Sequence, residues 1–300
     1  MVGTFKCVVV TFDIARHPCG SQDRGDHTDM HLQLEGKTAL VTGSSRGIGE
    51  AIARTLAPEG AHVLVHGRQR ARADAVAASI VASGGRATAI VGDLTRDEDV
   101  SRMLDHGLRA VGSIDILVNN AGGSAKSTQR WSNTHAGAWT EAFDRNVLAA
   151  LRVTTAVLPA MRAARWGRII FVSSTAATMP PARTPDYSAS KAAMNAMVAS
   201  LAKEVAEEGI TVNAISPGTV KSDALEARFR EVALEQGLVD EGAPWEAIER
   251  AALPLFAEVP MRRVGRLDEI AAAAAFLVSD MAGYITGVNL RVDGGQSPSL

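Results

Sequence analysis

Short apolar runs rich in β-branched residues alternate with alanine-rich stretches from Lys37 onward in this 300-residue chain. Most of the runs are apolar throughout, as strands buried on both faces of a sheet are. A helical stretch between successive strands returns the chain to the same end of the sheet, which favours parallel pairing. The pattern predicts an α/β fold with three layers, a doubly wound seven-stranded parallel sheet flanked by helices. The predicted strands are 37–42, 61–66, 86–91, 114–119, 168–173, 210–215 and 288–292.

No linker interrupts this alternation, so one domain is expected over residues 34–297. Residues 1–33 differ in character, because most of them are polar or turn-forming, and we expect a poorly ordered N-terminal extension. Its apolar core is too short for a signal peptide and is interrupted by Asp13. Folded sequence begins soon after Met30, which we expect to be the natural start.

Residues 222–260 depart from the strand–helix rhythm. Two helical patterns, separated by the loop signals Gly242-Ala243-Pro244, follow the sixth predicted strand directly. Ligands of doubly wound sheets bind beyond the carboxyl ends of the strands. The segment is therefore predicted to be a helical insert and a candidate lid over a substrate cleft. A surface excursion or an oligomer contact is the alternative.

Composition narrows the classes of function. The net charge is −2 and no basic run occurs, which argues against nucleic acid and anionic membranes as partners. No apolar stretch approaches the length of about 18 residues that a membrane-spanning helix needs. The two cysteines, Cys7 and Cys19, both lie near the N-terminus, so the rest of the chain has no disulfide framework and no thiolate metal site. We expect a cytoplasmic protein without a metal.

A glycine-rich turn, TGSSRGIG at 42–49, joins the first strand to the first helical stretch. Gly43 permits a tight turn, Gly47 lets the backbone approach a phosphate, and Gly49 lets the helix pack closely against the strand. The helix start then offers N–H groups and a partial positive charge to a pyrophosphate. Strand, turn and helix in this order predict a dinucleotide-binding site.

The end of the second strand indicates which dinucleotide binds. The group that contacts the adenosine ribose is expected about 20 residues after the glycine turn, where the chain has His66-Gly67-Arg68. No carboxylate is available there for a 2′-hydroxyl, whereas the guanidinium groups of Arg68 and Arg46 suit a 2′-phosphate. We therefore expect NADP(H) rather than NAD(H). The alternative is that both arginines are solvated surface residues.

Tyr187 and Lys191 are four residues apart in PDYSASKAAM, so on a helix they share one face. A free tyrosine ionises near pH 10 and is a poor proton donor at neutrality. A cation beside the phenol favours the phenolate and lowers that pKa, which would make Tyr187 a usable acid and base. On its own the pair could equally be an amphipathic helix with a solvated lysine.

The chain resembles the short-chain dehydrogenase/reductase superfamily, in its single-domain branch with a Rossmann fold. The resemblance extends from about residue 34 to 297 and includes GYITGVNLRVDGG near the C-terminus. The glycine turn does not fit the extended branch, and the tyrosine–lysine spacing does not fit the divergent enoyl reductases. The resemblance to the superfamily is carried by six motifs, which occur in this order: TGSSRGIG, NNAG at 119–122, Asn146, Ser173-Ser174, YSASK at 187–191 and Pro217-Gly218.

The resemblance implies four catalytic roles. Tyr187 would donate a proton to the carbonyl oxygen in reduction and accept one in oxidation. Lys191 would lower the pKa of Tyr187 and hold the nicotinamide ribose. Ser174, rather than its neighbour Ser173, would hydrogen-bond the substrate oxygen. Asn146 would hold a water that links Lys191 to solvent, although a satisfied core amide is the plain alternative.

The resemblance also implies the cofactor contacts. Asp93 would contact adenine, unless it is only a turn or capping residue, and Asn119 and Gly122 would approach the cofactor after the fourth strand. Pro217 and Gly218 would border the nicotinamide, with Thr219 on its carboxamide. The full expected set is Gly43, Ser45, Arg46, Gly47, Ile48, Gly49, Arg68, Asp93, Leu94, Asn120, Ala121, Gly122, Tyr187, Lys191, Pro217, Gly218 and Thr219.

The expected activity is hydride transfer between the nicotinamide of NADP(H) and a carbonyl or secondary alcohol. The substrate walls should come from 123–131, 175–186 and the insert. A medium apolar ketone or 3-oxoacyl thioester fits these walls better than a sugar phosphate. An NAD-dependent secondary alcohol dehydrogenase and a non-catalytic NADP-binding sensor are the alternatives. The wall residues are Trp131, Met179, Pro180, Pro181, Leu225 and Phe229, with Arg183 the lone nearby cation.

Two kinds of protein partner are considered. Arg162 and Arg165 could dock an acidic carrier protein, with solvated helix-end charges as the alternative. The family implies a homo-oligomer, a tetramer or dimer, through the helix that follows 132–138, the Tyr187 helix and the C-terminal strand. The stretch AAMNAMVASLA after Lys191 is apolar enough for such an interface, and core packing would explain it equally well.

Overall fold

Seven parallel strands form one sheet, in the order β3-β2-β1-β4-β5-β6-β7. They belong to a computed structural model of the chain that describes residues 32–124 and 130–298. The predicted strands and their parallel pairing are confirmed. Their bounds are β1 (Thr38–Val41), β2 (His62–Gly67), β3 (Arg86–Val91), β4 (Ile116–Asn119), β5 (Gly167–Val172), β6 (Ile210–Pro217) and β7 (Asn289–Val292).

The N-terminal extension expected at 1–33 lies outside the described residues except for its last two positions. Cys7, Cys19 and Met30 are therefore outside them as well. From Leu32 onward the chain groups into one compact unit, and Leu34 is already buried in its core.

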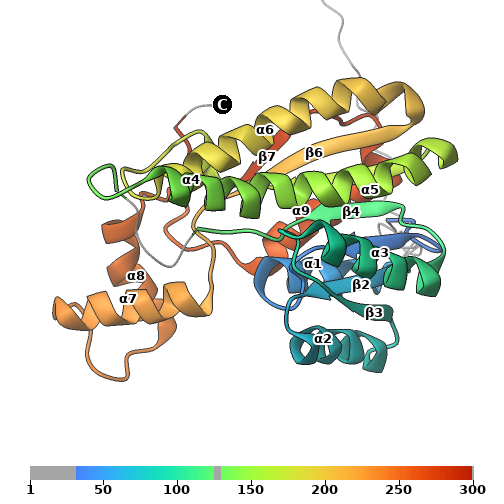
Figure 1. Ribbon diagram of the computed structural model, residues 1–300. Helices are drawn as coiled ribbons and strands as arrows, with labels where there is room; N and C mark the ends of the chain where they lie inside the picture. Colours follow the sequence, from blue (N-terminus) through green and yellow to red (C-terminus); the bar gives the residue numbers. More distant parts are fainter. Residues whose placement is uncertain (1–31, 125–129, 299–300) are drawn as a thin grey trace, which may run out of the picture. The chain divides into compact units, whose positions relative to one another are not determined.

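Helices cover both faces of the sheet (Figure 1). On one face lie α1 (Gly47–Leu56), α2 (Arg70–Ala82) and α9 (Leu267–Val278). On the other lie α3 (Asp97–Val111), α5 (Ala149–Ala164) and α6 (Pro185–Val205). Alternation along β1 feeds both cores, because Ala39 and Val41 pack on the first face and Leu40 on the second. The apolar strands are thus buried on both sides, as the sequence predicts.

One long helix runs through α4 (Ala136–Phe143), a π-helical turn at Asp144–Leu148 and α5. Its 29 residues are long and apolar enough, by length and composition, to cross a membrane. The prediction that no stretch approaches that length was therefore wrong for this helix. Val153, Val157 and Met161 face the core beneath α5, so packing on the sheet explains part of the apolar character of the helix.

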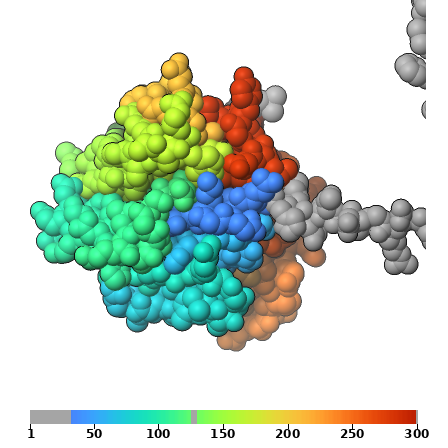
Figure 2. Space-filling view, turned by 90° about the vertical axis from the view of Figure 1, so that its right-hand side faces the viewer, coloured from blue at the N-terminus to red at the C-terminus, as the bar shows by residue number. Residues whose placement is uncertain are grey.

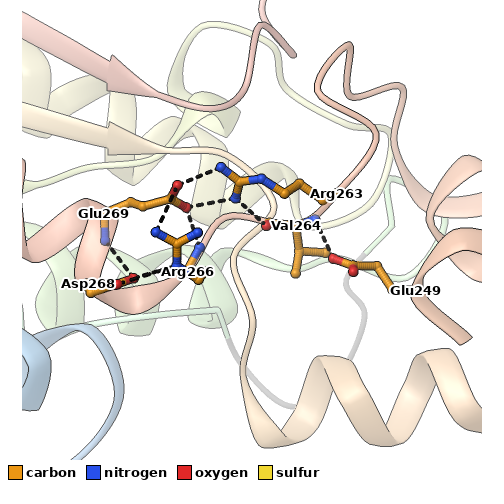
Figure 3. A network of polar contacts seen from close by, with 6 residues as sticks. All are labelled: Glu249, Arg263, Val264, Arg266, Asp268 and Glu269. Carbon is orange, nitrogen blue, oxygen red and sulfur yellow. Dashed lines mark hydrogen bonds and ion pairs between the residues drawn. The ribbon is translucent and has the colours of Figure 1, made fainter. Parts of the chain in front are cut away.

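The insert consists of α7 (Asp223–Glu235) and α8 (Trp245–Phe256), which pack on each other around a small core of their own. Phe229 lies in that core with its ring centre 4.7 Å from that of Phe256 and 6.0 Å from that of Trp245. Glu249 of α8 accepts from the Val264 backbone N–H at 2.7 Å, which ties the insert to the segment that leads into α9 (Figure 3). Arg263 binds both carboxylate oxygens of Glu269 at 2.6 and 2.9 Å.

β1 and β4 are neighbours in the sheet although two strands separate them in sequence. The chain winds away from this pair in opposite directions, which opens a crevice at their carboxyl ends. The glycine turn follows β1 and the NNAG segment follows β4. The remaining short helices are 3₁₀ turns at Thr175–Ala177, Ala206–Glu208 and Asp280–Ala282.

Candidate active site and cofactor cleft

Thr42, the first residue of the glycine turn, ties that turn to the segment after β4. Its hydroxyl donates to the carbonyl oxygen of Val118 and accepts from the backbone N–H groups of Asn120 and Ala121 at 2.9 and 3.0 Å. The Asn120 side chain donates to the carbonyl oxygens of Thr42 and Gly43 at 2.8 and 3.2 Å. Both expected cofactor segments therefore meet at the switch point of the sheet.

Gly43 and Gly49 lie where only glycine fits. Gly43 has a positive φ of 66°, and a Cβ there would lie 2.9 Å from Cα of Ala121. A Cβ on Gly49 would lie 2.6 Å from the Gly43 carbonyl oxygen and would also contact the Asn120 amide. The loop is therefore closed against α1 and β4, while around Gly47, also at positive φ, the corresponding space is open. Ile48 follows at the start of α1, partly buried against the core of that face.

A cavity of about 540 Å³ lies beyond the carboxyl ends of β2 and β3. Arg68 lines it, and Gly67 before it is so close to the glycine turn that a Cβ would lie 2.8 Å from the Ser45 hydroxyl. Arg68 therefore lies at the cavity, as the sequence predicts. Arg46 is the residue after Ser45, which Gly67 approaches. The lining residues are Arg68, Val91, Gly92, Asp93, Arg96, Asp99 and Arg102.

Asp93 lies in the cavity wall and also shapes its own turn. One carboxylate oxygen accepts from the Thr95 backbone N–H at 3.0 Å and from the Thr95 hydroxyl at 2.8 Å. The hydrogen bond from the Thr95 backbone is the main cause that lowers the pKa of Asp93. The turn-forming role of Asp93 is therefore seen, and its expected contact with adenine stays a prediction. Leu94, also in the expected set, is buried.

α6 begins at Pro185 and carries Tyr187 and Lys191 on the same side, one turn apart. The Lys191 ammonium lies 5.8 Å from the centre of the Tyr187 ring and donates to the carbonyl oxygen of Val172 at 2.7 Å. Burial lowers the pKa of Lys191 to about 8. The predicted pair is therefore brought together, with its cation inside the protein rather than in solvent.

The electrostatics of Tyr187 differ from the expectation. Burial raises the pKa of the phenol above its usual value, and a hydrogen bond with the Ser174 side chain offsets this in part. The expected lowering by Lys191 is not seen, because the ammonium binds the Val172 carbonyl and lies beside the ring. Desolvation, which disfavours the phenolate, therefore dominates here.

Ser174 is the serine that faces Tyr187. Its hydroxyl also accepts from the Ala176 backbone N–H at 3.1 Å, which caps the 3₁₀ turn and fixes the side chain. Ser173 is buried and its hydroxyl lies 3.5 Å from the carbonyl oxygen of Lys191, away from the phenol. Ser174 rather than Ser173 therefore lies at the phenol, and its contact with a substrate oxygen stays a prediction.

Asn146 is fully buried in the π-helical turn between α4 and α5. Its side-chain oxygen accepts from the Gly123 N–H at 2.8 Å, and its amide donates to the Ala142 carbonyl and the Ser190 hydroxyl. A Cβ on Gly122 would lie 2.5 Å from the Asn146 oxygen and 3.8 Å from the Lys191 ammonium. Asn146, Lys191 and the segment after β4 therefore form one connected group, and π-helical turns often mark functional sites.

Asn119 does not face the cleft. Its amide donates to the Thr154 hydroxyl at 2.9 Å inside the core, because the alternation along β4 turns this side chain toward α5. The expectation that Asn119 approaches the cofactor is corrected by this contact, whereas Asn120, Ala121 and Gly122 lie at the crevice.

The segment after β6 is held by the C-terminal part of the chain. The backbone N–H and the hydroxyl of Thr219 lie 3.1 and 3.2 Å from the Gln296 side-chain oxygen, and Gly218 donates to the Val292 carbonyl. A Cβ on Gly218 would lie 2.8 Å from Asp293, so this position requires glycine. Gln296 was missed by sequence reasoning, since nothing in the sequence marks a residue near the C-terminus as a partner of Thr219.

The expected substrate walls need two corrections. Phe229 is fully buried in the core of the insert, so its ring is not available to a substrate. Arg183 is not the lone nearby cation, because an antiparallel β-bridge pairs it with Arg130. Trp131 is 71% exposed beside Trp139, and residues 125–129 of the expected wall lie outside the described ones.

The two arginines considered for carrier docking are engaged within the chain. Arg162 pairs with Glu204 at 2.5 Å and with Glu208 at 2.9 Å, and Arg165 donates to the Glu207 carbonyl. Figure 2 shows this face, on which the end of α5 (yellow-green) and the end of α6 (gold) lie side by side. Carboxylates therefore occupy the Arg162 guanidinium, and a backbone carbonyl occupies that of Arg165.

Among residues 32–124 and 130–298, no group of three or more His, Cys, Asp or Glu side chains is placed to hold a metal ion. In the apolar stretch after Lys191, Met194 and Val198 are buried in the core beneath α6, whereas Ala192, Ala196 and Ala199 are exposed. Core packing therefore accounts for these two residues.

Known proteins resemble this chain in sequence over most of its length. The model of the short chain dehydrogenase family matches residues 37–233. The 3-oxoacyl-[acyl-carrier-protein] reductase FabG of Salmonella typhimurium is 37% identical over 265 residues, 88% of this chain and 98% of that protein. Glucose 1-dehydrogenase 2 of Bacillus subtilis is 33% identical, over 89% of this chain and 97% of its own length.

A solved structure extends the comparison. L-sorbose reductase from Gluconobacter frateurii, complexed with NADPH and L-sorbose, aligns with a TM-score of 0.82 and 33% identity, covering 90% of this chain and all of that one. The family model, the sequence relatives and the solved structure all indicate the same family. The chain belongs to the short-chain dehydrogenase family and is an oxidoreductase with a Rossmann fold.

Proposed function

We propose that this protein is an NADP(H)-dependent oxidoreductase that interconverts a small-molecule carbonyl and a secondary alcohol, with Tyr187 as the general acid and base. The observation that carries the proposal is the grouping of Ser174, Tyr187 and Lys191 with Asn146 at the same end of the sheet as the glycine turn. Bound NADPH supplies a hydride to the carbonyl carbon.

The side chains perform the proton chemistry. Ser174 and Tyr187 offer two hydroxyl groups to one substrate oxygen, and Tyr187 transfers its proton to that oxygen as hydride arrives. Lys191 keeps its charge below about pH 8 and would hold the hydroxyl groups of the nicotinamide ribose, while the Ser174 hydrogen bond favours the phenolate left behind. Asn146 uses one lone pair of its oxygen on Gly123 and keeps the other for a water between Lys191 and solvent.

The cavity beside Arg68 supports NADP(H) over NAD(H). Arg68 and Arg96 both line it, and neither has a carboxylate within salt-bridge distance in the described parts of the chain. Arg102, which also lines it, is paired with Asp99. Guanidinium groups bind phosphate well, whereas a ribose 2′-hydroxyl calls for a carboxylate at the end of β2. L-sorbose reductase, bound to NADPH in its solved structure, supports the same choice.

The substrate class is a free carbonyl compound, a medium apolar ketone or 3-oxoacyl thioester. Arg162 is already paired with two carboxylates and Arg165 with a backbone carbonyl, which disfavours an acidic carrier protein on that face. This separates the chain from its carrier-dependent relative, whose substrate is a 3-oxoacyl carrier protein by name. The proposal includes a cytoplasmic location.

Substitution of Tyr187 by phenylalanine tests the mechanism. Tyr187→Phe should lower kcat at least about 100-fold, since general acid catalysis contributes about 10²–10⁴-fold. The NADPH Kd should stay within about twofold because the ring remains. Tyr284→Phe is the matched control, because Tyr284 is the only other tyrosine and is fully exposed. If Tyr187→Phe keeps more than a tenth of kcat, the proposed proton donor is wrong.

Cofactor and substrate are tested together by steady-state kinetics with NADPH and NADH over ketones, diketones, 3-oxoacyl thioesters and sugars. The expected result is a kcat/KM with NADPH at least tenfold above that with NADH. Arg68→Asp should reduce or reverse this preference. A tenfold advantage for NADH instead would favour the NAD-dependent alcohol dehydrogenase. Tight NADPH binding without turnover on any substrate would favour the non-catalytic sensor.

The proposal also includes a homo-oligomer, a tetramer or a dimer. Leu148 and Leu151 are both 41% exposed along the helix that carries Asn146, and Val288 is exposed just before β7. Apolar side chains on these two elements support the interfaces that the family resemblance implies. Sedimentation of the full chain tests this; a monomer at micromolar concentration would contradict it.

A further inference from the structure

His66 is a buried polar side chain that the proposed chemistry does not use. It is the penultimate residue of β2 and only 2% of its surface is exposed. The side chain does not point into the cavity as Arg68 does. It lies between the glycine turn after β1 and the end of β3, two segments that both border the dinucleotide site.

All the polar groups of His66 are used. The ring Nδ1 accepts from the Gly43 backbone N–H at 3.0 Å, and the ring Nε2 lies 3.1 Å from the Gly92 carbonyl oxygen. The backbone N–H donates to the Ser44 hydroxyl, and the backbone carbonyl accepts from the Ser44 N–H at 2.8 Å. Three of the four bonds therefore reach the glycine turn.

The partners fix the tautomer. A carbonyl oxygen can only accept, so Nε2 carries the proton toward Gly92, and Nδ1 keeps its lone pair for Gly43. A protonated imidazole would set two N–H groups of Gly43 and His66 against each other. Burial, in line with this, lowers the pKa of His66 to about 4, with Asp93 opposing the shift and Arg68 adding to it.

The two hydrogen bonds of the imidazole ring reach two different walls of the dinucleotide site. Gly43 has a positive φ, and the bond to Nδ1 satisfies an N–H that the tight turn leaves without a backbone partner among the described residues. Gly92 lines the 540 Å³ cavity between Val91 and Asp93. The imidazole ring is thus a spacer of fixed length between the pyrophosphate turn and the adenosine cavity.

We propose that His66 is a positioning residue for the adenosine half of the dinucleotide, which sets the separation between the glycine turn and the Gly92 wall. This rests on the proposed function only in that the cleft binds NADP(H). His66 touches neither the nicotinamide site nor Tyr187, so it acts on cofactor affinity and leaves the chemical step unchanged.

The test uses three variants of His66, one that removes both hydrogen bonds of the ring and two that each keep one of them. His66→Leu removes both. His66→Asn keeps an oxygen at the position of Nδ1 for Gly43, and His66→Gln keeps a donor at the position of Nε2 for Gly92. The matched control is His62→Leu, since His62 lies on the same strand and also bridges to β3, through the Thr88 hydroxyl at 2.9 Å, away from the glycine turn.

The readouts are Kd values for NADPH and for adenosine 2′,5′-bisphosphate by calorimetry, kcat and KM for NADPH, and Tm. We expect His66→Leu to weaken both ligands by about 10- to 100-fold, the equivalent of one unpaired buried donor, with kcat within twofold. His66→Asn should restore most of this affinity, His66→Gln less, and His62→Leu should bind as the wild type does.

Three outcomes would overturn the proposal. One is wild-type affinity in His66→Leu, and another is an equal loss in the Asn and Gln variants. The third is a fall of kcat in step with affinity and Tm, which a merely structural residue would give. If His66→Leu fails to fold, the ratio of the NADPH Kd values of His66→Asn and His66→Gln decides the question alone. A wild-type protein that binds neither NADPH nor NADH would instead refute the proposed function itself, so the two failures are distinguishable.

Discussion

The dinucleotide cleft and the helical insert are held together by different means. In the cleft, Thr42, His66 and Asn120 join neighbouring strands through hydrogen bonds of buried or half-buried neutral groups. In the insert, α7 and α8 share a small aromatic core, and a partly exposed ion pair between Arg263 and Glu269 holds the segment that follows it at the start of α9 (Figure 3). Directional bonds between packed strands allow one geometry, whereas a small core and screened charges allow several of similar energy.

This difference separates two tasks. Hydride transfer needs a cofactor held in one position, which suits a rigid cleft. Relatives named for sugars and for acyl carriers share this fold, so the substrate side has to vary. An insert with its own core can change or move without disturbing the strands, as a lid requires. We therefore expect substitutions in the two regions to separate cofactor binding from substrate binding.

The largest effect is expected from a methyl group in the glycine turn. Gly49→Ala places its Cβ against the Gly43 carbonyl and the Asn120 amide, and overpacking of this kind costs about 1–3 kcal/mol. The NADPH Kd should rise by up to about a hundredfold, measured by fluorescence titration.

The matched control is Gly242→Ala in the loop of the insert. Gly242 has a φ of 90° and nothing within 4 Å of a Cβ, so only about 1 kcal/mol of backbone strain is expected, without loss of NADPH affinity. Equal effects on NADPH binding would show that the two regions are not separable.

Substitution of two fully buried phenylalanines, one in the sheet and one in the insert, is the next test of the difference between the two regions. Phe171 lies in β5 and Phe229 in α7, and truncation of either to alanine costs about 3–5 kcal/mol. Phe171→Ala should lower the Tm of the whole protein. Phe229→Ala should loosen α7 and α8 alone, raising the KM for the carbonyl substrate about tenfold with the NADPH Kd within twofold.

Amide hydrogen exchange shows where each change acts. In Phe229→Ala, protection should fall across the insert and stay unchanged in β1 and β4. Faster exchange throughout the central strands would mean that the insert and the sheet unfold as one unit, and the proposed division would be wrong.

The sequence was sufficient for the strands, because their apolar runs differ in period and length from the helices between them. It was sufficient to place Tyr187 near Lys191, which depends only on helical spacing. It could not give the direction in which the pKa of Tyr187 moves. That direction depends on burial and on the Val172 carbonyl that binds Lys191, a contact between distant parts of the chain.

The same limit explains the other misses. His66 and Asn119 are polar residues in apolar strands, and their partners Gly43, Gly92 and Thr154 are more than 20 residues away in sequence. Phe229 belongs to a helix whose apolar side packs on α8 rather than on a cleft, which periodicity alone cannot distinguish. What the sequence withholds is which neighbour a buried side chain meets.

The smallest expected effect concerns the charges that join the insert to α9. Hydrogen bonds from Arg263 are the main cause that lowers the pKa of Glu269 to about 2. Because a carboxyl with a lowered pKa stabilises the fold above its unfolded pKa, this contribution is present above about pH 4.5 and is lost as the pH falls toward 2. Arg263→Met should therefore cost about 1 kcal/mol at pH 7, and its Tm difference from the wild type should shrink at pH 3.

Arg228→Met is the control for that variant, because Arg228 forms a single exposed pair with Glu231 on α7 and joins the insert to nothing else in the described residues. It should cost less than Arg263→Met at pH 7 and leave the KM for the substrate unchanged, whereas Arg263→Met should raise that KM about twofold. A Tm difference for Arg263→Met that is the same at pH 7 and pH 3 would mean that packing of the Arg263 side chain, and not its ion pair, holds the insert to α9. The contrast between the two regions would then lose its electrostatic part and rest on the small aromatic core of the insert alone.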